Sequence, residues 1–336
     1  MSSSDTTRAA IVGISGPALT GAEAALLRAC PPAGVILFGR NVQEPRQLAA
    51  LTAALRQVLP PEAELMVDQE GGRVARLRPP HWQAHPPAAA IGALFETDPA
   101  RALRAAWLTG ALIGLDCRSA GFTIAAAPVL DLRVPGAHDV IGDRAYAAHP
   151  AIVARLGRAV AAGLMAAGVL PVGKHAPGHG RTRVDSHLAP PYVDEADLTL
   201  DIQPFRLNAD LPWLMTAHIV YRAIDPALPA TLSPRVIGTI IRRRIGFEGV
   251  LVTDDLAMQA LSGSRADLAA QALAAGCDLA LYCTGDPATN EALLRTCPPL
   301  SDATRRRVTA ARAAVAARTL RLDAAALAQE REHLLG

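Results

Sequence analysis

Ionisable side chains are concentrated in one irregular segment of the sequence, residues 174–187. It reads KHAPGHGRTRVDSH and contains three histidines, one lysine, two arginines and one aspartate. Its two glycines and its proline argue against a regular helix. Asp185 and His187 lie two residues apart, so the carboxylate could orient the imidazole and stabilise its protonated form. Since a histidine that titrates near neutral pH can donate and then accept a proton, this pair is a candidate general acid/base.

Asp254 is the candidate nucleophile. It follows the apolar run GVLVT at residues 249–253, so a buried strand would set the direction of its side chain. A positioned carboxylate is the usual nucleophile when a glycoside is hydrolysed with retention of configuration. That reaction also needs a proton donor for the leaving oxygen, which the Asp185–His187 pair could provide.

Further polar side chains that could bind a ligand follow other apolar runs. The donors are Arg76, Arg144, Lys174 and His175, and Asp68 can accept hydrogen bonds. Donors and acceptors that converge in a pocket suit a polyhydroxylated ligand such as a sugar. A single acid at the end of a strand could simply cap the next helix, but caps rarely need histidine and lysine together.

Eight short apolar runs form the scaffold that would position these side chains. Each is rich in Val, Ile, Leu, Ala or Met and ends in polar or Gly-rich sequence. Continuous apolarity without alternation is typical of strands buried on both faces of a parallel sheet. The runs lie at residues 8–15, 34–41, 64–72, 122–131, 168–175, 212–218, 249–255 and 278–285.

Helical patterns separate these runs. They cover residues 45–58, 98–114, 150–167, 233–244 and 264–275. Pro45 and Pro150 suit the first turns of their helices. Alternating strands and helices indicate a parallel sheet with right-handed crossovers, and eight strands predict an α/β fold of the closed (β/α)8, or TIM-barrel, type. An open doubly wound sheet is the alternative, although no GxGxxG follows the first run.

We interpret residues 1–336 as a single catalytic barrel domain, with residues 302–334 as a helical tail packed on it. No Pro/Gly/Ser-rich linker divides the chain, and no internal repeat is visible beyond the strand–helix alternation. In such barrels the active site lies at the carboxyl ends of the strands. Asp68, Asp254 and the 174–187 segment all follow strands, so we expect them to meet at one end of the barrel.

Composition and charge exclude several classes of protein. The 336 residues include 33 basic and 31 acidic side chains, a formal net charge of +2, and 51% are hydrophobic. This balance offers no basic surface for nucleic acid. The N-terminus lacks the pattern of a signal peptide, and no run of about 18 apolar residues predicts a transmembrane helix. We therefore expect a cytoplasmic protein that binds neither nucleic acid nor membrane.

Metal sites and disulfides are poorly supported by the sequence. The five cysteines are odd in number and form no CxxC pair, which indicates buried, reduced thiols. A catalytic metal would have to use Asp68, His175, His218 and Asp254. No HxH pair is present, and Lys174 with the nearby arginines would repel a divalent cation, so we favour a site without a metal. Gly178 and Gly180 could bind phosphate, but GHG without a following GK[ST] is a weak motif.

Taken together, several motifs resemble those of the bacterial β-N-acetylglucosaminidases of glycoside hydrolase family 3 that act in cell-wall recycling. The 174–187 segment resembles the signature loop of that family. The other motifs follow in the family's order: LFGRN at 37–41, VDQEGGRVARL at 67–77, IAAAPVLD at 124–131, IGDRAY at 141–146, AHIVY at 217–221 and VTDDLAM at 252–258. Six ordered matches are very improbable by chance, so the resemblance is specific.

The resemblance implies a (β/α)8 barrel that uses no metal and no organic cofactor. It places the nucleophile on Asp254, the general acid/base on His187 and its carboxylate partner on Asp185. Sugar-binding positions fall on Asp68, Arg76, Arg144, Lys174 and His175. The implied activity is exo-acting, retaining hydrolysis of the β-1,4 bond between N-acetylglucosamine and N-acetylmuramic or anhydro-N-acetylmuramic acid in peptidoglycan fragments. We expect a monomer whose partner is this small-molecule carbohydrate.

Two details of the sequence qualify the resemblance. The β-glucosidase branch of the family usually takes its acid/base carboxylate from a second domain. We expect this chain to use the pair formed by Asp185 and His187 instead. Ala176 replaces the aromatic residue that is usual in KHFPGHG, which could loosen the loop. Two other functions stay open: a β-N-acetylglucosaminide phosphorylase, in which phosphate replaces water, and a non-catalytic barrel that binds muropeptides.

Overall fold

The computed structural model describes residues 7–134, 136, 139–182, 191–194 and 197–336. His187 and Asp185, the predicted acid/base pair, lie outside these residues. Eight parallel strands close into a barrel in the order β1-β10-β9-β7-β5-β4-β3-β2. The strands are β1 (Arg8–Gly13), β2 (Pro32–Leu37), β3 (Glu64–Val67), β4 (Ile124–Ala125), β5 (Leu170–Ala176), β7 (Trp213–Thr216), β9 (Val250–Asp255) and β10 (Leu279–Tyr282).

The closed barrel confirms the predicted fold and excludes the open doubly wound sheet. Each of the eight predicted apolar runs overlaps one barrel strand, although β2 begins two residues before its run and β5 ends one residue after its run. Burial on both faces explains the continuous apolarity, since all six residues of β2 and all seven of β5 are buried. Two short strands, β6 (Tyr192–Val193) and β8 (Val220–Tyr221), pair with each other outside the barrel.

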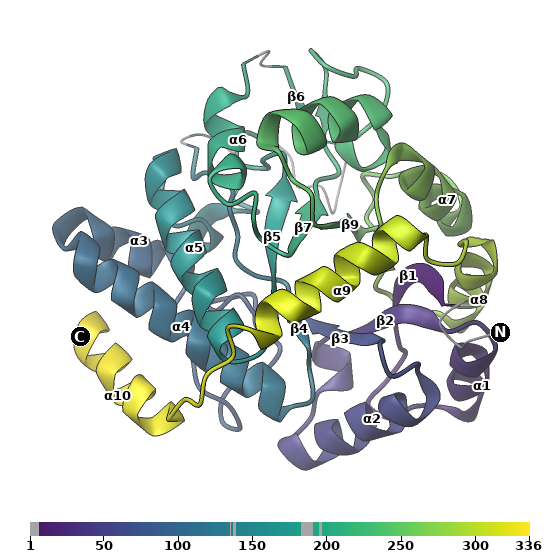
Figure 1. The fold of residues 1–336 in the computed structure, drawn as a ribbon, viewed down its shortest axis with the longest axis horizontal. Helices are drawn as coiled ribbons and strands as arrows, with labels where there is room; N and C mark the ends of the chain where they lie inside the picture. Colours follow the sequence, from purple (N-terminus) through teal and green to yellow (C-terminus); the bar gives the residue numbers. More distant parts are fainter. Residues whose placement is uncertain (1–6, 135, 137–138, 183–190, 195–196) are drawn as a thin grey trace.

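Helices surround the barrel (Figure 1). The predicted helical segments correspond to α2 (Pro45–Val58), α4 (Pro99–Ser119), α5 (Pro150–Ala166), η5 (Val236–Ile245) and α7 (Arg265–Ala275), of which η5 is a π-helix. Pro45 and Pro150 occupy first turns, as predicted. Among the described residues, four short α-helices lie outside the predicted segments: α1 (Gly21–Ala29), α3 (Ala88–Thr97), α6 (Thr199–Arg206) and α8 (Pro287–Thr296).

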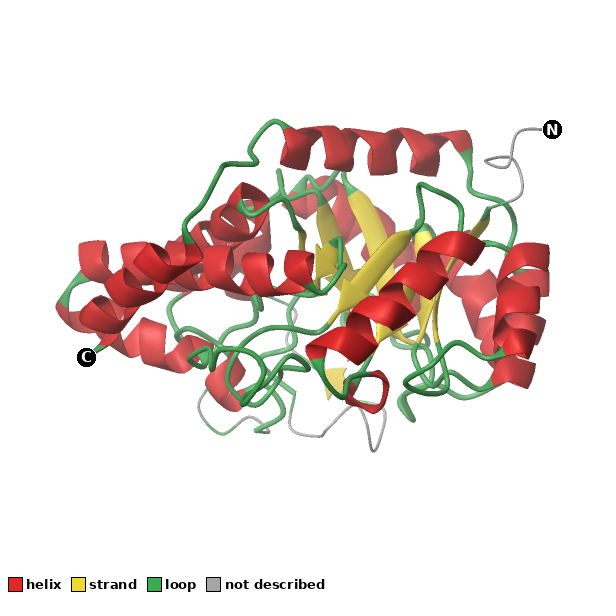
Figure 2. Ribbon diagram, turned by 90° about the horizontal axis from the view of Figure 1, so that it is seen from below, coloured by secondary structure: helices red, strands yellow, loops and turns green. Residues whose placement is uncertain are grey.

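The predicted tail forms two helices, α9 (Asp302–Ala316) and α10 (Ala324–Leu335). α9 lies across one end of the barrel, opposite the end where most loops gather (Figures 1 and 2). Its Ala311 and Val315 pack with the apolar side chains of the barrel interior. Arg312 Nε lies 2.7 Å from Glu64 Oε1 at the start of β3. α9 therefore closes the amino-terminal end of the barrel.

The second tail helix, α10, packs along α4 at the side of the barrel. Arg104 of α4 makes two hydrogen bonds of 2.6 Å to the carboxylate of Glu330, and Arg101 Nε donates to Leu334 O at 2.6 Å. Arg331 is buried. Both surface and buried contacts thus attach α10 to the barrel.

The described residues also bear on the cysteines and on membrane insertion. All five cysteines are buried free thiols, as predicted. In the part of the chain that the structure describes, no helix has the length and apolarity needed to cross a lipid bilayer. Trp213, which lies fully buried in β7, contributes to the barrel core.

Candidate active site

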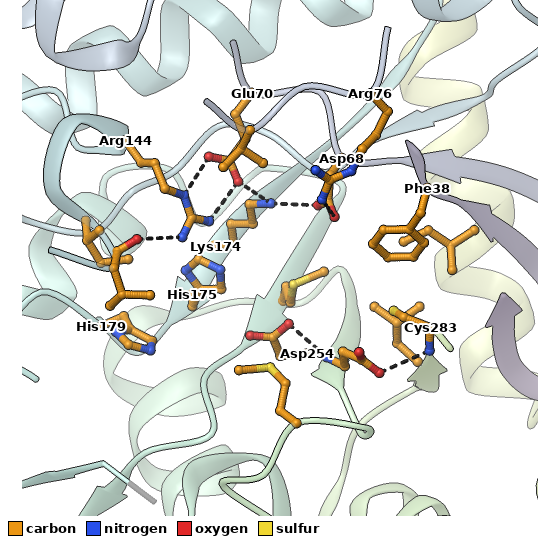
Figure 3. Close-up of a pocket in the computed structure, with 18 residues that line it drawn as sticks. Phe38, Asp68, Glu70, Arg76, Arg144, Lys174, His175, His179, Asp254 and Cys283 are labelled. Atoms are coloured by element: carbon orange, nitrogen blue, oxygen red, sulfur yellow. Dashed lines mark hydrogen bonds and ion pairs between the residues drawn. The ribbon is translucent and has the colours of Figure 1, made fainter. Parts of the chain in front are cut away.

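A cavity opens at the carboxyl ends of the barrel strands. Its volume is about 170 Å³, more than ten times the roughly 10–15 Å³ that one water needs, so it can hold a ligand the size of a monosaccharide. Half of its 18 lining residues are polar (Figure 3): Asp68, Glu70, Arg76, Arg144, Lys174, His175, His179, Asp254 and Asp255. Its apolar lining includes Phe38, Met215, Met258 and Cys283.

A network of ion pairs forms one wall of the cavity (Figure 3). Lys174 Nζ lies 3.0 Å from Asp68 Oδ1 and 2.6 Å from Glu70 Oε1. Arg144 makes two hydrogen bonds of 2.8 Å to the two oxygens of Glu70. Arg76 Nη2 lies 3.1 Å from Asp68 Oδ2. Because three cations and two carboxylates hold one another, the positions of all five side chains depend on each other.

This network keeps its members charged. Burial alone would raise the pKa of Asp68, but Lys174 and Arg76 outweigh burial and lower the pKa. The pKa of Glu70 is also lowered in spite of burial, because Arg144 and Lys174 stabilise its carboxylate. Burial would lower the pKa of Lys174, yet Asp68 and Glu70 raise it. At neutral pH the wall therefore presents charged donors and acceptors to a ligand.

A fully buried carboxylate, Asp131, anchors the start of the 174–187 segment. It accepts the backbone N–H of His175 at 3.2 Å and that of His179 at 2.7 Å, and its Oδ2 lies 2.7 Å from His175 Nδ1. Burial would raise the pKa of Asp131, but His175 and His179 lower it, so the group is an acceptor. Nδ1 of His175 therefore carries a proton, and Asp131 sets the orientation of the ring.

Asp254, near the end of β9, lies on the opposite side of the cavity from the Lys174 network (Figure 3). Within the described residues, its carboxylate accepts one hydrogen bond, from the backbone N–H of Asp255 at 2.8 Å. Burial would raise the pKa of Asp254, but His175 and His218 lower it overall. A carboxylate that is ionised and has lone pairs facing a cavity can act as a nucleophile.

Asp255 and His218 support the turn that carries Asp254. The Asp255 carboxylate accepts the N–H groups of Ala257 at 2.9 Å and of Cys283 at 3.0 Å. His218 Nε2 lies 2.9 Å from the carbonyl oxygen of Asp255, and its Nδ1 lies 2.7 Å from Thr231 Oγ1. These bonds connect the ends of β7, β9 and β10, so Asp254 is held by three neighbouring strands.

Comparisons with known proteins identify the family. Residues 12–316 match the model of the glycosyl hydrolase family 3 N terminal domain. The chain belongs to glycosyl hydrolase family 3. It is 42% identical over 304 residues to a β-hexosaminidase of Alkalilimnicola ehrlichii, a match that covers 87% of this chain and 86% of that protein. A β-hexosaminidase of Bordetella parapertussis is 40% identical over 293 residues, which cover 85% and 82% of the two proteins.

A solved structure from family 3 has the same fold. NagZ from Neisseria gonorrhoeae, in complex with N-trifluoroacetyl-D-glucosamine, superimposes with a TM-score of 0.87 at 31% identity and covers 98% of this chain and 99% of its own. The family match and the β-hexosaminidase relatives show that the chain is an enzyme, a glycoside hydrolase of the β-hexosaminidase type. The alternative of a non-catalytic barrel is therefore wrong.

Six of the eight residues predicted for the family 3 site line the cavity: Asp68, Arg76, Arg144, Lys174, His175 and Asp254. They come from separate segments and meet because the carboxyl ends of parallel strands share one end of a barrel. His187 and Asp185 belong to the same segment as Lys174, but they lie outside the described residues. The catalytic and binding roles of all eight residues stay predictions.

Three further residues lie at the candidate site and were absent from the predicted set: Glu70 and His179, which line the cavity, and Asp131, which bonds to His175 and His179. Glu70 lies two residues after Asp68 in one motif, and Asp131 ends the fourth apolar run, so both were visible as acids at strand ends. Their bonds to Lys174 and His175 were not visible, because those partners come from another strand. Burial and the neighbouring His175 lower the pKa of His179 to about 4, so its ring is neutral at neutral pH.

The two glycines of the 174–187 segment have packing roles. A Cβ on Gly180 would lie 2.2 Å from Leu132 O. Gly178 has a φ of +138°, and its carbonyl accepts a hydrogen bond of 2.7 Å from Tyr221 Oη. Close packing thus accounts for both glycines without a phosphate. Ala176 is fully buried in β5, and its carbonyl accepts the Ala217 N–H at 2.8 Å, so the backbone is held at this position.

Three of the four residues considered as metal ligands line the same cavity, but within the described structure the four do not form a metal-binding cluster. Among the residues that the structure describes, no three His, Cys, Asp or Glu side chains form a cluster that could hold a metal ion. Asp68 instead pairs with Lys174 and Arg76, and His218 bonds to Thr231 and to a backbone carbonyl. The donor set considered from the sequence is thus used for contacts within the protein.

Proposed function

We propose that the chain is a retaining, exo-acting β-N-acetylglucosaminidase. It would release N-acetylglucosamine from β-1,4-linked peptidoglycan fragments, such as its disaccharide with anhydro-N-acetylmuramic acid and the corresponding muropeptides. The observation that carries this proposal is the ionised Asp254 carboxylate, which faces a cavity of monosaccharide size across from the Lys174 network. The β-hexosaminidase relatives support the choice of an N-acetylhexosamine.

The first step forms a covalent glycosyl-enzyme. An oxygen of Asp254 attacks the anomeric carbon, and the bond from that carbon to the leaving sugar breaks. His187, protonated and paired with Asp185, donates its proton to the departing oxygen. The leaving sugar therefore departs as a neutral alcohol, and the sugar at the cavity becomes an ester of Asp254 with inverted configuration.

The second step hydrolyses this ester. Neutral His187 accepts a proton from water while the water oxygen attacks the anomeric carbon from the face opposite Asp254. The ester bond breaks and returns its electron pair to the Asp254 carboxylate. Two inversions restore the β configuration, and His187 is again protonated for the next cycle.

In this proposal Asp68, Arg76, Arg144, Lys174 and His175 bind the hydroxyl groups of the terminal sugar. A hydroxyl can donate to Asp68 and accept from Lys174 at the same time, because the two groups lie 3.0 Å apart. Their mutual bonds fix the direction of each, which favours one orientation of the ring. The small cavity supports exo action, since it has room for one terminal sugar.

The charges around the cavity favour water over phosphate as the acceptor. Among the described lining residues, the carboxyl groups of Asp68, Glu70, Asp254 and Asp255 outnumber the cations Arg76, Arg144 and Lys174. Each of these cations already pairs with a carboxylate. A phosphate dianion would have to compete with these carboxylates for the cations, which supports hydrolysis rather than phosphorolysis. Formation of N-acetylglucosamine 1-phosphate in phosphate buffer would support the phosphorylase instead.

Covalent trapping tests the proposal directly. A 5-fluoro-N-acetylglucosaminyl fluoride should react faster than its ester hydrolyses, so the protein should gain the mass of one sugar. Peptide mapping should place the adduct on Asp254, and a 2-acetamido group on the inactivator should be required. An adduct on another side chain, or continued hydrolysis without any adduct, would contradict the proposed nucleophile.

The leaving group tests the role of His187. His187→Ala should slow the cleavage of the natural disaccharide far more than that of a nitrophenyl N-acetylglucosaminide, because nitrophenolate departs with little need for a proton. Asp185→Asn should show the same trend to a smaller degree. Equal losses for both leaving groups would remove His187 from the acid role.

We also propose that residues 1–336 form one domain that acts as a monomer without a metal. Activity should survive EDTA, light scattering should give a mass near 35.1 kDa, and unfolding should be one cooperative transition. Loss of activity on chelation, restored by adding a metal ion, would contradict this part.

A further inference from the structure

A chain of three side chains, two of them buried and Asp116 partly buried, links the C-terminal helix to residues 68–87, the segment between β3 and α3. Arg331 of α10 is 5% exposed, and its Nη1 lies 2.7 Å from His85 Nδ1. His85 is 7% exposed, and its Nε2 lies 2.9 Å from Asp116 Oδ2 of α4. Arg331 Nη2 also donates to Ala84 O at 3.3 Å and to Gln83 Oε1 at 3.4 Å. The cation of α10 therefore contacts residues 83–85 directly.

The chemistry of these groups determines where the protons lie. A guanidinium has only donors, so His85 Nδ1 must accept from Arg331 and carries no proton. Nε2 then carries the proton and donates it to Asp116. Burial lowers the pKa of His85 and Arg331 lowers it further, although Asp116 acts in the opposite direction. Glu332 of α10 is the other acid that acts on Arg331. A neutral imidazole thus joins a buried cation to a carboxylate.

The backbone around His85 supports a tight turn at residues 70–74. His85 O accepts the N–H of Gly72 at 2.9 Å. Gly71 and Gly72 have φ values of +98° and +54°. A Cβ at Gly71 would lie 2.5 Å from Pro86 O, and one at Gly72 would lie 2.7 Å from Pro87 Cβ. The turn therefore rests directly on residues 85–87.

The same turn carries a central member of the cavity wall. Glu70 opens the turn, and its N–H donates to Val74 O at 2.9 Å. The Glu70 carboxylate holds both Lys174, at 2.6 Å, and Arg144, at 2.8 Å. A shift of residues 85–87 would move this carboxylate, and the two cations bound to it would move as well.

We propose that Arg331 is a positioning residue for the sugar site. Through His85 it holds residues 85–87 against the 70–74 turn. This turn positions Glu70, and Glu70 orients Lys174 and Arg144. Arg331 does not line the cavity and acts only through these contacts. The inference rests on the proposed function, because it takes the Lys174 network as the wall that binds the sugar. It makes α10 a part of the catalytic unit.

The interface between α4 and α10 contains a matched control. Arg104 and Glu330 also pair across these two helices, but their side chains are 44% and 41% exposed and touch neither His85 nor the turn. An exposed pair of this kind contributes little to stability. Arg104→Gln therefore perturbs the docking of α10 without touching the chain of three side chains.

Kinetics of the full-length protein test the proposal. Arg331→Met should lower kcat/KM for a nitrophenyl N-acetylglucosaminide by about tenfold, because small displacements of positioning groups are costly. Arg331→Lys, which keeps a cation and a donor for Nδ1, should recover most of this loss. Arg104→Gln should stay within about twofold of wild type. If Arg331→Met does not fold, Arg331→Lys and His85→Gln serve in its place, and His85→Gln should also lose about tenfold.

The histidine provides a second readout, because its tautomer and its pKa both depend on the contact with Arg331. In NMR spectra of histidine-labelled protein, wild-type His85 should be the Nε2–H tautomer. In Arg331→Met the pKa of His85 should rise, since the cation that lowers it is gone. Arg104→Gln should leave both properties unchanged.

Three results would overturn the inference. The first is a folded Arg331→Met protein with kcat/KM within twofold of wild type, and the second is an equal loss in Arg104→Gln. The third is a protonated Nδ1 on wild-type His85. Failure of the proposed function looks different: the wild-type protein itself would then cleave no N-acetylglucosaminide, and the inference would fall with it.

Discussion

The two ends of the barrel both bury carboxylates, but they use them differently. At the amino-terminal end, Asp278 precedes β10 and is fully engaged. It accepts the Leu251 N–H at 2.9 Å and the Thr304 hydroxyl at 2.9 Å. It also pairs with Arg242 at 2.9 Å and with Arg307 of α9 at 2.8 Å. Four partners thus occupy its two oxygens.

At the carboxyl end, Asp254 has the opposite arrangement. Within the described residues its carboxylate accepts one hydrogen bond, from the N–H of Asp255, although burial would favour more. Its charge is maintained by the surrounding histidines rather than by a bonded cation. Its remaining lone pairs face the cavity, which is the active site of this chain in our proposal.

This difference predicts that Asp278 contributes to the stability of the fold, whereas Asp254 contributes to catalysis. A carboxylate whose lone pairs are all occupied cannot attack a ligand, and its removal leaves buried cations without a partner. A carboxylate with free lone pairs is available to a ligand, and its removal leaves few groups unpaired. The ammonium group of Lys174 combines both properties, because it is paired with carboxylates of the protein and also lines the cavity. Substitutions at the two ends should therefore change different measurements.

The largest effect is expected for Asp254→Asn. The amide oxygen can still accept from Asp255 N–H, but it cannot form the glycosyl ester, so kcat should fall by about 10⁴-fold or more. The free energy of unfolding should change by less than about 1 kcal/mol. Steady-state kinetics and urea unfolding measure the two quantities. A large loss of stability would show that Asp254, like Asp278, stabilises the fold, and it would contradict the difference between the two ends of the barrel.

A smaller loss of activity is expected for Lys174→Met. The change removes the ammonium that joins Asp68 to Glu70 and, in our proposal, a donor to the sugar, so kcat/KM should fall by about 10²-fold. Arg307→Met removes a cation at the opposite end of the barrel and should keep kcat/KM within about twofold. Similar losses in both variants would show that the two ends are not separate.

Asp278→Asn should have the reverse profile. It leaves Arg242 and Arg307 without their shared countercharge, so the free energy of unfolding should fall by about 3 kcal/mol. The kcat/KM of the folded protein should match wild type when it is measured well below the melting temperature. A variant that keeps its stability but loses activity would reverse the roles assigned to the two ends.

The smallest effect is the pH dependence of stability from His179, beside the cavity. Its folded pKa is lowered to about 4 by burial and His175, so unfolding takes up a proton below the unfolded value of about 6.5. Stability should be full above pH 6.5 and should decline as the pH falls toward 4. Between pH 7 and 5 we expect a loss of up to about 2 kcal/mol, to which His85 contributes in the same direction.

Denaturant unfolding at several pH values measures this slope. His179→Gln should make this slope shallower. An equal slope in His179→Gln and wild type would show that His179 does not titrate differently in the folded protein.

The barrel strands were predictable because each is buried on both faces and therefore continuously apolar. The short helices α1, α3, α6 and α8 were not, since two or three turns contain too few apolar positions to define a helical period. The π-helix η5 shows a related limit. Its buried residues Val236, Ile237, Ile240, Ile241 and Ile245 fit an α-helical pattern equally well, so the sequence predicted a helix there without its type.

The sequence predicted those residues of the candidate site that directly follow an apolar run, such as Asp68 and Asp254. Partners from other strands were not predictable, because one sequence contains no information on which side chain meets which across the barrel. Arg331 is the extreme case, since it contacts His85 over a separation of 246 residues. Nothing near Arg331 in the sequence marks it as different from the exposed arginines of the tail.

By itself, the sequence determined the barrel, the family and most of the polar side chains around the cavity, since apolar runs and short motifs are local properties of the chain. Only the tertiary structure decided which charges are bonded to which: Asp278 to two arginines, Glu70 to Lys174 and Arg144, and Arg331 to His85. The reason is physical. Whether a buried carboxylate is saturated or free to react depends on neighbours brought together by barrel closure, and those neighbours lie far apart in the chain.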